Sequence, residues 1–487
     1  MTPPAVSQTP PQAAAPPAPL PPAAPLLIHQ RQDAGPGLPA LRPAPAAAQP
    51  RWSLLRRIGF RFLIIYVLLY FLPMPVRDFI SGFGTVGGKT LEPVTAKAME
   101  YLSFYDKAWE SVVIPVGKRL FDVDIKVVPT GSGDTAFAYT QVLCIFVFAT
   151  AGALTWSLLD RRRLAYPRLH EWLRVYVRYV LALTMLGYGL AKVIQTQFPP
   201  PGPERLLQTF GSASPMGLLW TFMGASTAYT FFSGFMECLG GLLLIPRRTV
   251  TLGAMVVVGT MLNVVLLNFC YDVPVKQYSV HLTLMALWLT LPDLPALMAV
   301  LLRTRPVPPA PVQPLFQRAW LRYSALALGL ALIGTNVYGN MTQNYEFWKQ
   351  MNDRTGLSPL AGIYEVESFD CQPGTATAPA NDKSRWRRVI IHDYKTRLVL
   401  AVQQLDDQMP RYMITDDPEK KAITVALRTD PTKSGTLAYS NPEPGVLTLE
   451  GSFLGDTITA RLRKNDKPDS LLMTRGFNWV QEFPFNR

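Results

Sequence analysis

The stretch that decides the fold is TVTLGAMVVVGTMLNVVLLNF, residues 249–269, which contains no charged side chain. A helix rises about 1.5 Å per residue, so this run is long enough to cross the roughly 30 Å hydrocarbon core of a bilayer. Six further apolar runs lie at 60–76, 137–159, 172–195, 226–245, 279–301 and 317–337. The sequence therefore predicts an α-helical integral membrane protein with about seven transmembrane helices.

The distribution of charge agrees with a membrane protein and argues against a nucleic-acid-binding one. Charged residues make up only 17% of the chain, whose net charge is +13. Much of that excess is arginine beside alternate ends of the apolar runs, at 51, 56, 57 and 61, at 161–163, at 247–248, and at 303 and 305. Because basic residues stay on the cytoplasmic side, we expect a bacterial inner-membrane protein with a cytoplasmic N-terminus and a periplasmic C-terminal domain.

The chain divides into five segments. Residues 1–50 hold 15 of the 45 prolines and almost no charge, so we expect a disordered tail. Residues 51–136 carry the first transmembrane helix and a long outer loop with amphipathic stretches, 137–301 a helical bundle, and 302–345 the last transmembrane helix. Ser214 before Pro215 has the composition of a helix start, and the short apolar helix after it is expected at the outer interface or re-entering the membrane.

Residues 346–487 have the pattern of a β-rich extracytoplasmic domain. Side chains alternate with period two at 362–369, 388–391, 398–402, 423–427 and 457–462, with turn signals such as Asp416-Asp417-Pro418 between them. Several short strands at this spacing predict an all-β soluble barrel or sandwich. A disulfide between Cys270 and Cys371 is left open, and no C-x-x-C motif is present.

Glu237 is the clearest candidate for a functional residue, because an ionisable side chain within a membrane span is costly and usually functional. Gly234, Glu237 and Gly241 share one face of their helix. Small residues allow helices to approach closely, so we expect Glu237 to point into the bundle. The alternative is a structural role in helix packing, since buried polar groups need partners whatever the function.

A second group of polar residues lies toward the outer leaflet. Lys192 is predicted above Glu237, where it would stabilise charge, and the candidate ligand-binding residues are Tyr188, Asn263, Asn268, Asp272, Lys276 and His281. His281 has no second histidine near it, so no metal site is predicted. Residues near a membrane interface can also reach water and serve no function.

The order of these residues resembles a known family. Gly187-Tyr188-Gly189-Leu190-Ala191-Lys192 ends one helix, and the next carries Phe235-Met236-Glu237-Cys238-Leu239-Gly240-Gly241 followed by Pro246-Arg247-Arg248. Together they resemble the membrane core of the DoxX-like family over residues 137–301. The resemblance implies a four-helix membrane bundle, an association with thiosulfate–quinone oxidoreduction or other redox and thiol-stress complexes, and Lys192 and Glu237 as site residues. The C-terminal domain is similar to a lipocalin-like barrel through Gly362-x-Tyr364 and Arg475-Gly476-Phe477-Asn478-Trp479, which implies room for one small apolar ligand.

Three functions remain open. The first is a membrane subunit or accessory of a redox system that binds a quinone-like lipophile, with Glu237 handling a proton and a redox partner protein supplying electrons. The second is a lipid-binding or envelope-protein assembly factor that acts through the outer β domain. The third is a transporter of small solutes, although no inverted repeat is visible. The sequence leaves open whether the protein is an enzyme.

Overall fold

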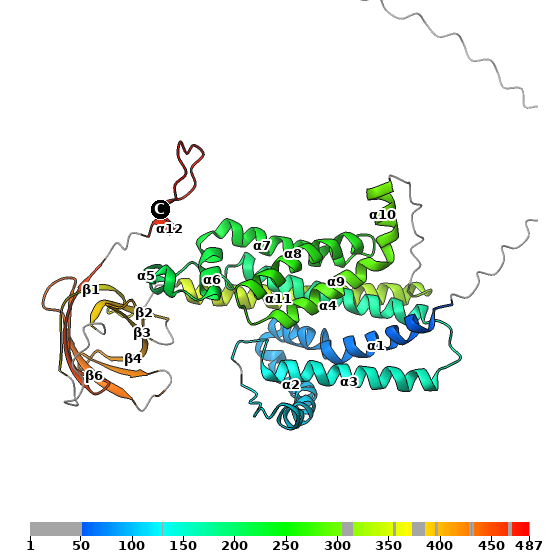
Figure 1. Cartoon of the computed structure of the whole chain (residues 1–487), viewed down its shortest axis with the longest axis horizontal. Helices are drawn as coiled ribbons and strands as arrows, with labels where there is room; N and C mark the ends of the chain where they lie inside the picture. Colours follow the sequence, from blue (N-terminus) through cyan, green and yellow to red (C-terminus); the bar gives the residue numbers. More distant parts are fainter. Residues whose placement is uncertain are drawn as a thin grey trace, which may run out of the picture. The chain divides into compact units, whose positions relative to one another are not determined.

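A computed structural model describes residues 51–128, 130–303, 315–353, 357–372, 385–394, 398–427, 430, 433–465 and 470–486 (Figure 1). The tail predicted to be disordered, residues 1–50, lies outside these ranges. The described chain contains a helical region followed by a β-barrel.

The helical region has the composition and helix lengths of a membrane protein. Its long helices are α1 (Leu54–Phe71), α2 (Val76–Phe121), α3 (Ala136–Leu159), α4 (Pro167–Val193), α7 (Thr227–Leu244), α8 (Val250–Cys270), α9 (Lys276–Thr290) and α11 (Ala319–Asn352), and the shorter α10 (Leu294–Arg303) follows α9. Five helical segments in the described residues are long and apolar enough to cross a membrane: Leu54–Gly87, Ala136–Leu159, Thr227–Leu244, Val250–Cys270 and Lys276–Leu302. Helices α4 and α11 occupy the other two predicted positions but are more polar, so seven spans stay a prediction.

Helix α4 is more polar than the other spans, yet much of it is buried in the bundle. Its buried side chains include Val177, Val180, Leu181 and Met185, and α7 packs along it. The guanidinium of Arg178, also buried, donates hydrogen bonds to the carbonyl oxygens of Leu244 (3.1 Å) and Ile245 (2.7 Å). These carbonyl groups lie at the C-terminal end of α7 and have no partner within their own helix. Arg178 of α4 therefore caps α7.

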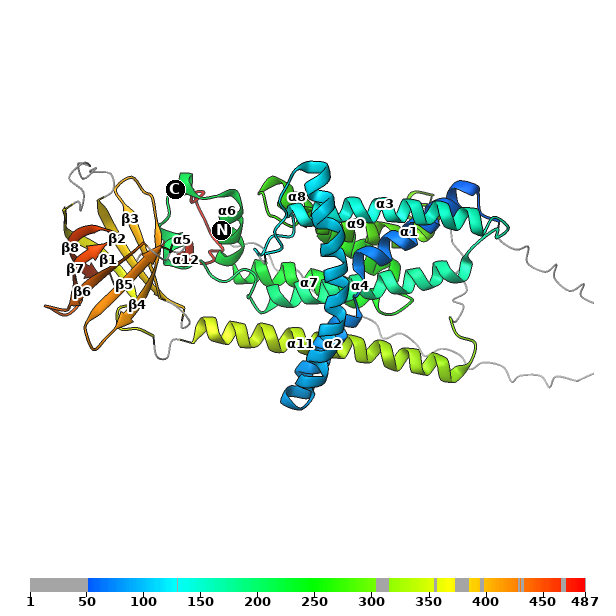
Figure 2. The same ribbon diagram turned by 90° about the horizontal axis from the view of Figure 1, so that it is seen from below.

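The loop predicted after the first span is the 46-residue helix α2, which runs across α11 (Figure 2). The two helices cross at Gly82, where a Cβ atom would lie 2.4 Å from the carbonyl oxygen of Thr335. Only a glycine permits this approach.

Three short helical segments follow α4: α5 (Pro203–Leu207), η1 (Phe210–Ser212) and α6 (Pro215–Ala225). The helix start predicted at Ser214 is confirmed, since its hydroxyl accepts a hydrogen bond from the backbone N–H of Gly217 at 3.1 Å. The 3.1 Å contact is the usual cap of a helix N-terminus.

The C-terminal domain is a closed barrel and not a sandwich. Its strands are β1 (Gly362–Gln372), β2 (Trp386–Asp393), β3 (Leu398–Gln404), β4 (Arg411–Asp417), β5 (Ala422–Leu427), β6 (Ser434–Ser440), β7 (Val446–Phe453) and β8 (Asp456–Lys464). Each strand pairs antiparallel with the next, and β8 returns to pair with β1. Across this closure Glu367 accepts hydrogen bonds from Arg461 and Arg463, which lower the pKa of its carboxyl group. The described cysteines, including Cys270 and Cys371, are free thiols.

Apolar side chains fill the barrel. Trp386 and Tyr412 both contact the ring of Phe453, with centroids 5.0 and 4.9 Å away, and Leu400, Val425, Leu437 and Leu449 are fully buried in the same cluster. An eight-stranded barrel is just wide enough for its own side chains to fill. The barrel thus has a lipocalin-like topology, and its own side chains fill the interior at this cluster.

Candidate functional site

The candidate site forms where α4 and α7 cross through a pair of glycines. A Cβ atom on Gly189 would lie 2.6 Å from the carbonyl oxygen of Gly234, and one on Gly234 would lie 2.6 Å from that of Gly189. The same atom on Gly234 would lie 2.7 Å from the Cβ of Lys192. The absence of side chains thus lets two helix backbones touch, and it brings Lys192 of α4 beside Glu237 of α7.

Lys192 and Glu237 form a buried ion pair. The ammonium Nζ donates to both carboxylate oxygens, at 2.7 Å to Oε1 and 2.6 Å to Oε2. Only 5% of Lys192 and 2% of Glu237 is exposed. Burial removes both charged groups from water, and each becomes the other's partner. Their attraction is much stronger at low dielectric than in water.

The pair faces a cavity of about 310 Å³ bounded by α4, α6, α7, α8 and the start of α9. Most of its wall is apolar and aromatic, with side chains including Phe198, Met216, Leu219, Trp220, Phe222, Met223, Met261 and Val264. A charged pair at one point of an otherwise apolar cavity is the arrangement expected for a ligand with a polar head and an apolar body.

Other polar groups line the same cavity. The ring of Tyr188 lies 5.8 Å from the Lys192 ammonium, and Asn263 is part of the wall. The side-chain amide of Asn268 donates to the Ser279 hydroxyl at 3.0 Å. The carbonyl oxygen of the Gln197 side chain is buried and has no hydrogen-bond partner in the described part of the chain. A bound donor or a water molecule at this oxygen would satisfy it.

Of the residues predicted from the sequence, Tyr188, Lys192, Glu237, Asn263 and Asn268 line the cavity together. Lys192, which was predicted above Glu237, is in direct contact with it.

The remaining three predicted residues do not line the cavity. Asp272 and Lys276 form an ion pair at 2.8 Å, and the aspartate side chain is 84% exposed. The ring of His281 hydrogen-bonds the Tyr66 hydroxyl (2.7 Å) and the Gln277 carbonyl oxygen (2.7 Å), and it stacks on Tyr70. These geometries match an exposed ion pair and a packing histidine.

Sequence reasoning missed several parts of the wall: Gln197, Ser233 and Tyr278, and the side chains of α6. The only signal for α6 was an apolar stretch too short to span a membrane. That pattern does not show which part of the fold the stretch covers. Among the described residues no three histidine, cysteine, aspartate or glutamate side chains gather as a metal site would require.

Comparisons with known proteins give one match to report. Over 112 residues, 23% of its length, the chain is 39% identical to the uncharacterized protein YwoB of Bacillus subtilis (strain 168), and the match covers 70% of that protein. No family model and no solved structure matches the chain.

Proposed function

The chain belongs to the family of the uncharacterized Bacillus subtilis protein YwoB, and we propose that it binds a quinone-like lipophile beside Lys192 and Glu237. It acts as a membrane subunit or accessory of a redox system, in keeping with the DoxX-like pattern of these residues. Helices α4 and α11 complete seven spans, with the N-terminus in the cytoplasm and the barrel in the periplasm of a bacterial inner membrane.

The observation that carries the proposal is that the ion pair lines a cavity. Lys192 and Glu237 are almost completely buried, yet both line a cavity of about 310 Å³ whose wall is otherwise largely apolar. A pair that only fixed helix packing would need no cavity beside it. Keeping a charge pair in a membrane span is costly and usually serves a function. A polar ring at the pair with an apolar tail along α6 would match both parts of the wall.

The side chains have separate roles in this proposal. A quinone would supply the electron-accepting chemistry, and its reduction consumes protons as well as electrons. Lys192 would donate a hydrogen bond to a ring carbonyl, and Glu237 would exchange a proton with it. Electrons would come from a redox partner protein, since the chain carries no C-x-x-C motif.

The test is the binding of decylubiquinone to purified protein in lipid nanodiscs, followed by tryptophan fluorescence quenching and native mass spectrometry. Removing a hydrogen bond to a charged group costs about 1.5–3 kcal/mol, so Glu237→Gln should weaken binding by roughly ten- to a hundredfold. The matched control is Asp272→Asn, which changes a carboxylate outside the cavity and should bind like the wild type. Equal affinity of wild type and Glu237→Gln would contradict the proposal.

A second function is favoured by a different observation. After β8 the chain leaves large apolar side chains in solvent, with Phe477 77%, Trp479 91% and Phe483 84% exposed. Exposed aromatic side chains of this kind mark binding surfaces for membranes or proteins. On this alternative the chain is a lipid-binding or envelope-protein-binding factor. Deletion of residues 470–487 should then abolish the binding of lipid or envelope protein, while Glu237→Gln leaves that binding intact.

A further inference from the structure

One outer face of the barrel is buried, although outward-facing barrel residues normally meet solvent. Along β3, Leu400 and Val402 point into the barrel core, and the alternate residues Val399, Ala401 and Gln403 point outward. These three are only 8%, 0% and 2% exposed. Something outside the barrel therefore covers this face.

The cover is the segment that follows α4. Residues 51–487 belong to one structural unit, and within it Leu207 at the end of α5 packs against Ile363, Ile390 and Ala401 on the outside of β1, β2 and β3. Three apolar side chains from three adjacent strands thus form a patch on the barrel, and a leucine of the helical region occupies it.

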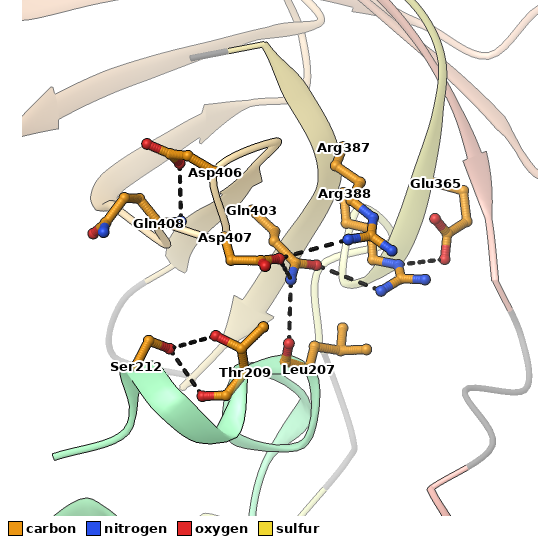
Figure 3. Close-up of polar contacts among 10 residues, drawn as sticks. All are labelled: Leu207, Thr209, Ser212, Glu365, Arg387, Arg388, Gln403, Asp406, Asp407 and Gln408. Carbon is orange, nitrogen blue, oxygen red and sulfur yellow. Dashed lines mark hydrogen bonds and ion pairs between the residues drawn. The ribbon is translucent and has the colours of Figure 1, made fainter. Parts of the chain in front are cut away.

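Polar contacts fix the position of this leucine (Figure 3). The side-chain amide of Gln403 donates to the carbonyl oxygen of Leu207 at 3.2 Å and to Asp407 at 3.3 Å. Its carbonyl oxygen accepts from Arg388 at 3.5 Å, and Arg388 in turn binds Glu365 at 2.6 Å. Because both ends of this buried amide are hydrogen-bonded, the Gln403 side chain holds one orientation. Its hydrogen bond therefore fixes the position of Leu207 on the barrel.

An ion pair adds to this contact. Glu204 of α5 is 8% exposed, and its Oε2 accepts from Nε of Arg411 on β4 at 2.6 Å. The contact between α5 and the barrel therefore has an apolar centre at Leu207, a buried hydrogen bond at Gln403 and a largely buried carboxylate at Glu204. Together these contacts hold α5 against the barrel.

The docked segment is continuous with the cavity wall. A Cβ atom on Gly217 in α6 would lie 2.5 Å from the guanidinium of Arg205 in α5, and one on Gly224 would lie 2.2 Å from the carbonyl oxygen of Pro199. The segment from Pro199 to α6 is thus packed against itself at both ends of α6. Helix α6 supplies Met216, Leu219, Trp220, Phe222 and Met223 to the cavity.

We propose that the barrel is a positioning element for the ligand cavity: by holding Glu204 and Leu207 it fixes α6 as the wall opposite the Lys192–Glu237 pair. The positioning residues are Gln403 and Arg411, which do not line the cavity themselves. The consequence for ligand binding rests on the proposed function. The effect of the barrel on the position of α6, through its contacts with α5, does not. Weakening the contact should open the cavity without altering the ion pair.

The experiment measures access to the cavity directly in the full chain. Ser233 lines the cavity, so Ser233→Cys is placed in a background with the four native cysteines replaced by alanine, and its labelling by a water-soluble maleimide is timed in nanodiscs. Hydrogen–deuterium exchange of residues 215–225 is measured on the same samples. Leu207→Ala and Ala401→Arg disturb the contact from its two sides. Thr424→Arg, which adds the same side chain at an exposed position of β5, is the matched control.

We expect Leu207→Ala and Ala401→Arg to accelerate both labelling and exchange about three- to tenfold, because loss of the contact made by the half-buried Leu207 lowers the free energy of local opening. Thr424→Arg should leave both rates unchanged. If Ala401→Arg disrupts the barrel, Leu207→Ala still tests the proposal, since Leu207 lies outside the barrel. Unchanged rates in Leu207→Ala would overturn it. A failure of decylubiquinone to bind the wild type would remove the proposed function alone.

Discussion

Replacing Lys192 by methionine is expected to destabilise the helical bundle by about 3–5 kcal/mol, because Glu237 is then buried without its partner. The carboxylate is 2% exposed and both of its oxygens accept from the Lys192 ammonium. The measurement is unfolding of the purified protein in dodecyl maltoside with increasing SDS, followed by far-UV circular dichroism. Asp272→Asn breaks the exposed ion pair with Lys276, and it should change stability by less than about 1 kcal/mol.

The double variant Lys192→Met/Glu237→Met separates structure from function. With both charges gone, no unpaired group is buried, and an apolar replacement of a buried ion pair is often neutral or stabilising by about 1–4 kcal/mol. Stability should therefore return to near that of the wild type, while decylubiquinone binding is lost. If the double variant were stable and bound decylubiquinone normally, the pair would be a packing feature and the proposed site would be wrong.

The fold was predictable wherever a local pattern determines structure. Apolar runs of membrane length located α3, α7, α8 and α9, and the serine before Pro215 located the start of α6. Alternation and turn signals predicted β strands, but only long-range pairing decides between a barrel and a sandwich. The pairing of β1 with β8 joins residues about a hundred positions apart, and no local pattern encodes it.

The candidate site was predictable in part for the same reason. Gly234 and Gly241 on the face of Glu237 indicated close helix packing, and the structure places Lys192 directly at that carboxylate. The sequence could not separate Asn268, which lines the cavity, from Asp272, which lies one turn further, is exposed and does not line it. That difference depends on where α8 ends and the chain turns, within one or two residues.

The polarity of two elements also reflects tertiary contacts. Two buried charges of α4 are satisfied by α7, since Arg178 binds the carbonyl oxygens at its end and Lys192 binds Glu237. Hydropathy alone therefore understates the place of α4 in the bundle. The outward side chains of β3 are apolar or buried because α5 covers them. In both cases the residue types become intelligible only when the partner is known.

The glycine crossing gives the second large prediction. Gly234→Ala should destabilise the bundle by about 3 kcal/mol, at the upper end of the cost of overpacking. The new Cβ would meet the carbonyl oxygen of Gly189 at 2.6 Å, Cβ of Lys192 at 2.7 Å and the backbone nitrogen of Val193 at 2.9 Å. Two of these atoms are backbone, so α4 and α7 must move apart, and Lys192 must move away from Glu237. Unfolding in SDS and decylubiquinone binding should both be affected.

Gly259→Ala is the matched control, because it makes the same substitution in α8 where a Cβ atom would meet nothing within 4 Å. Alanine favours helix by up to about 1 kcal/mol over glycine, so this variant should be neutral or slightly more stable and should bind normally. A loss confined to Gly234→Ala would tie both stability and binding to the distance between the two helices. Equal behaviour of the two variants would mean that α4 and α7 tolerate separation, and the close crossing would then not be what assembles the Lys192–Glu237 pair.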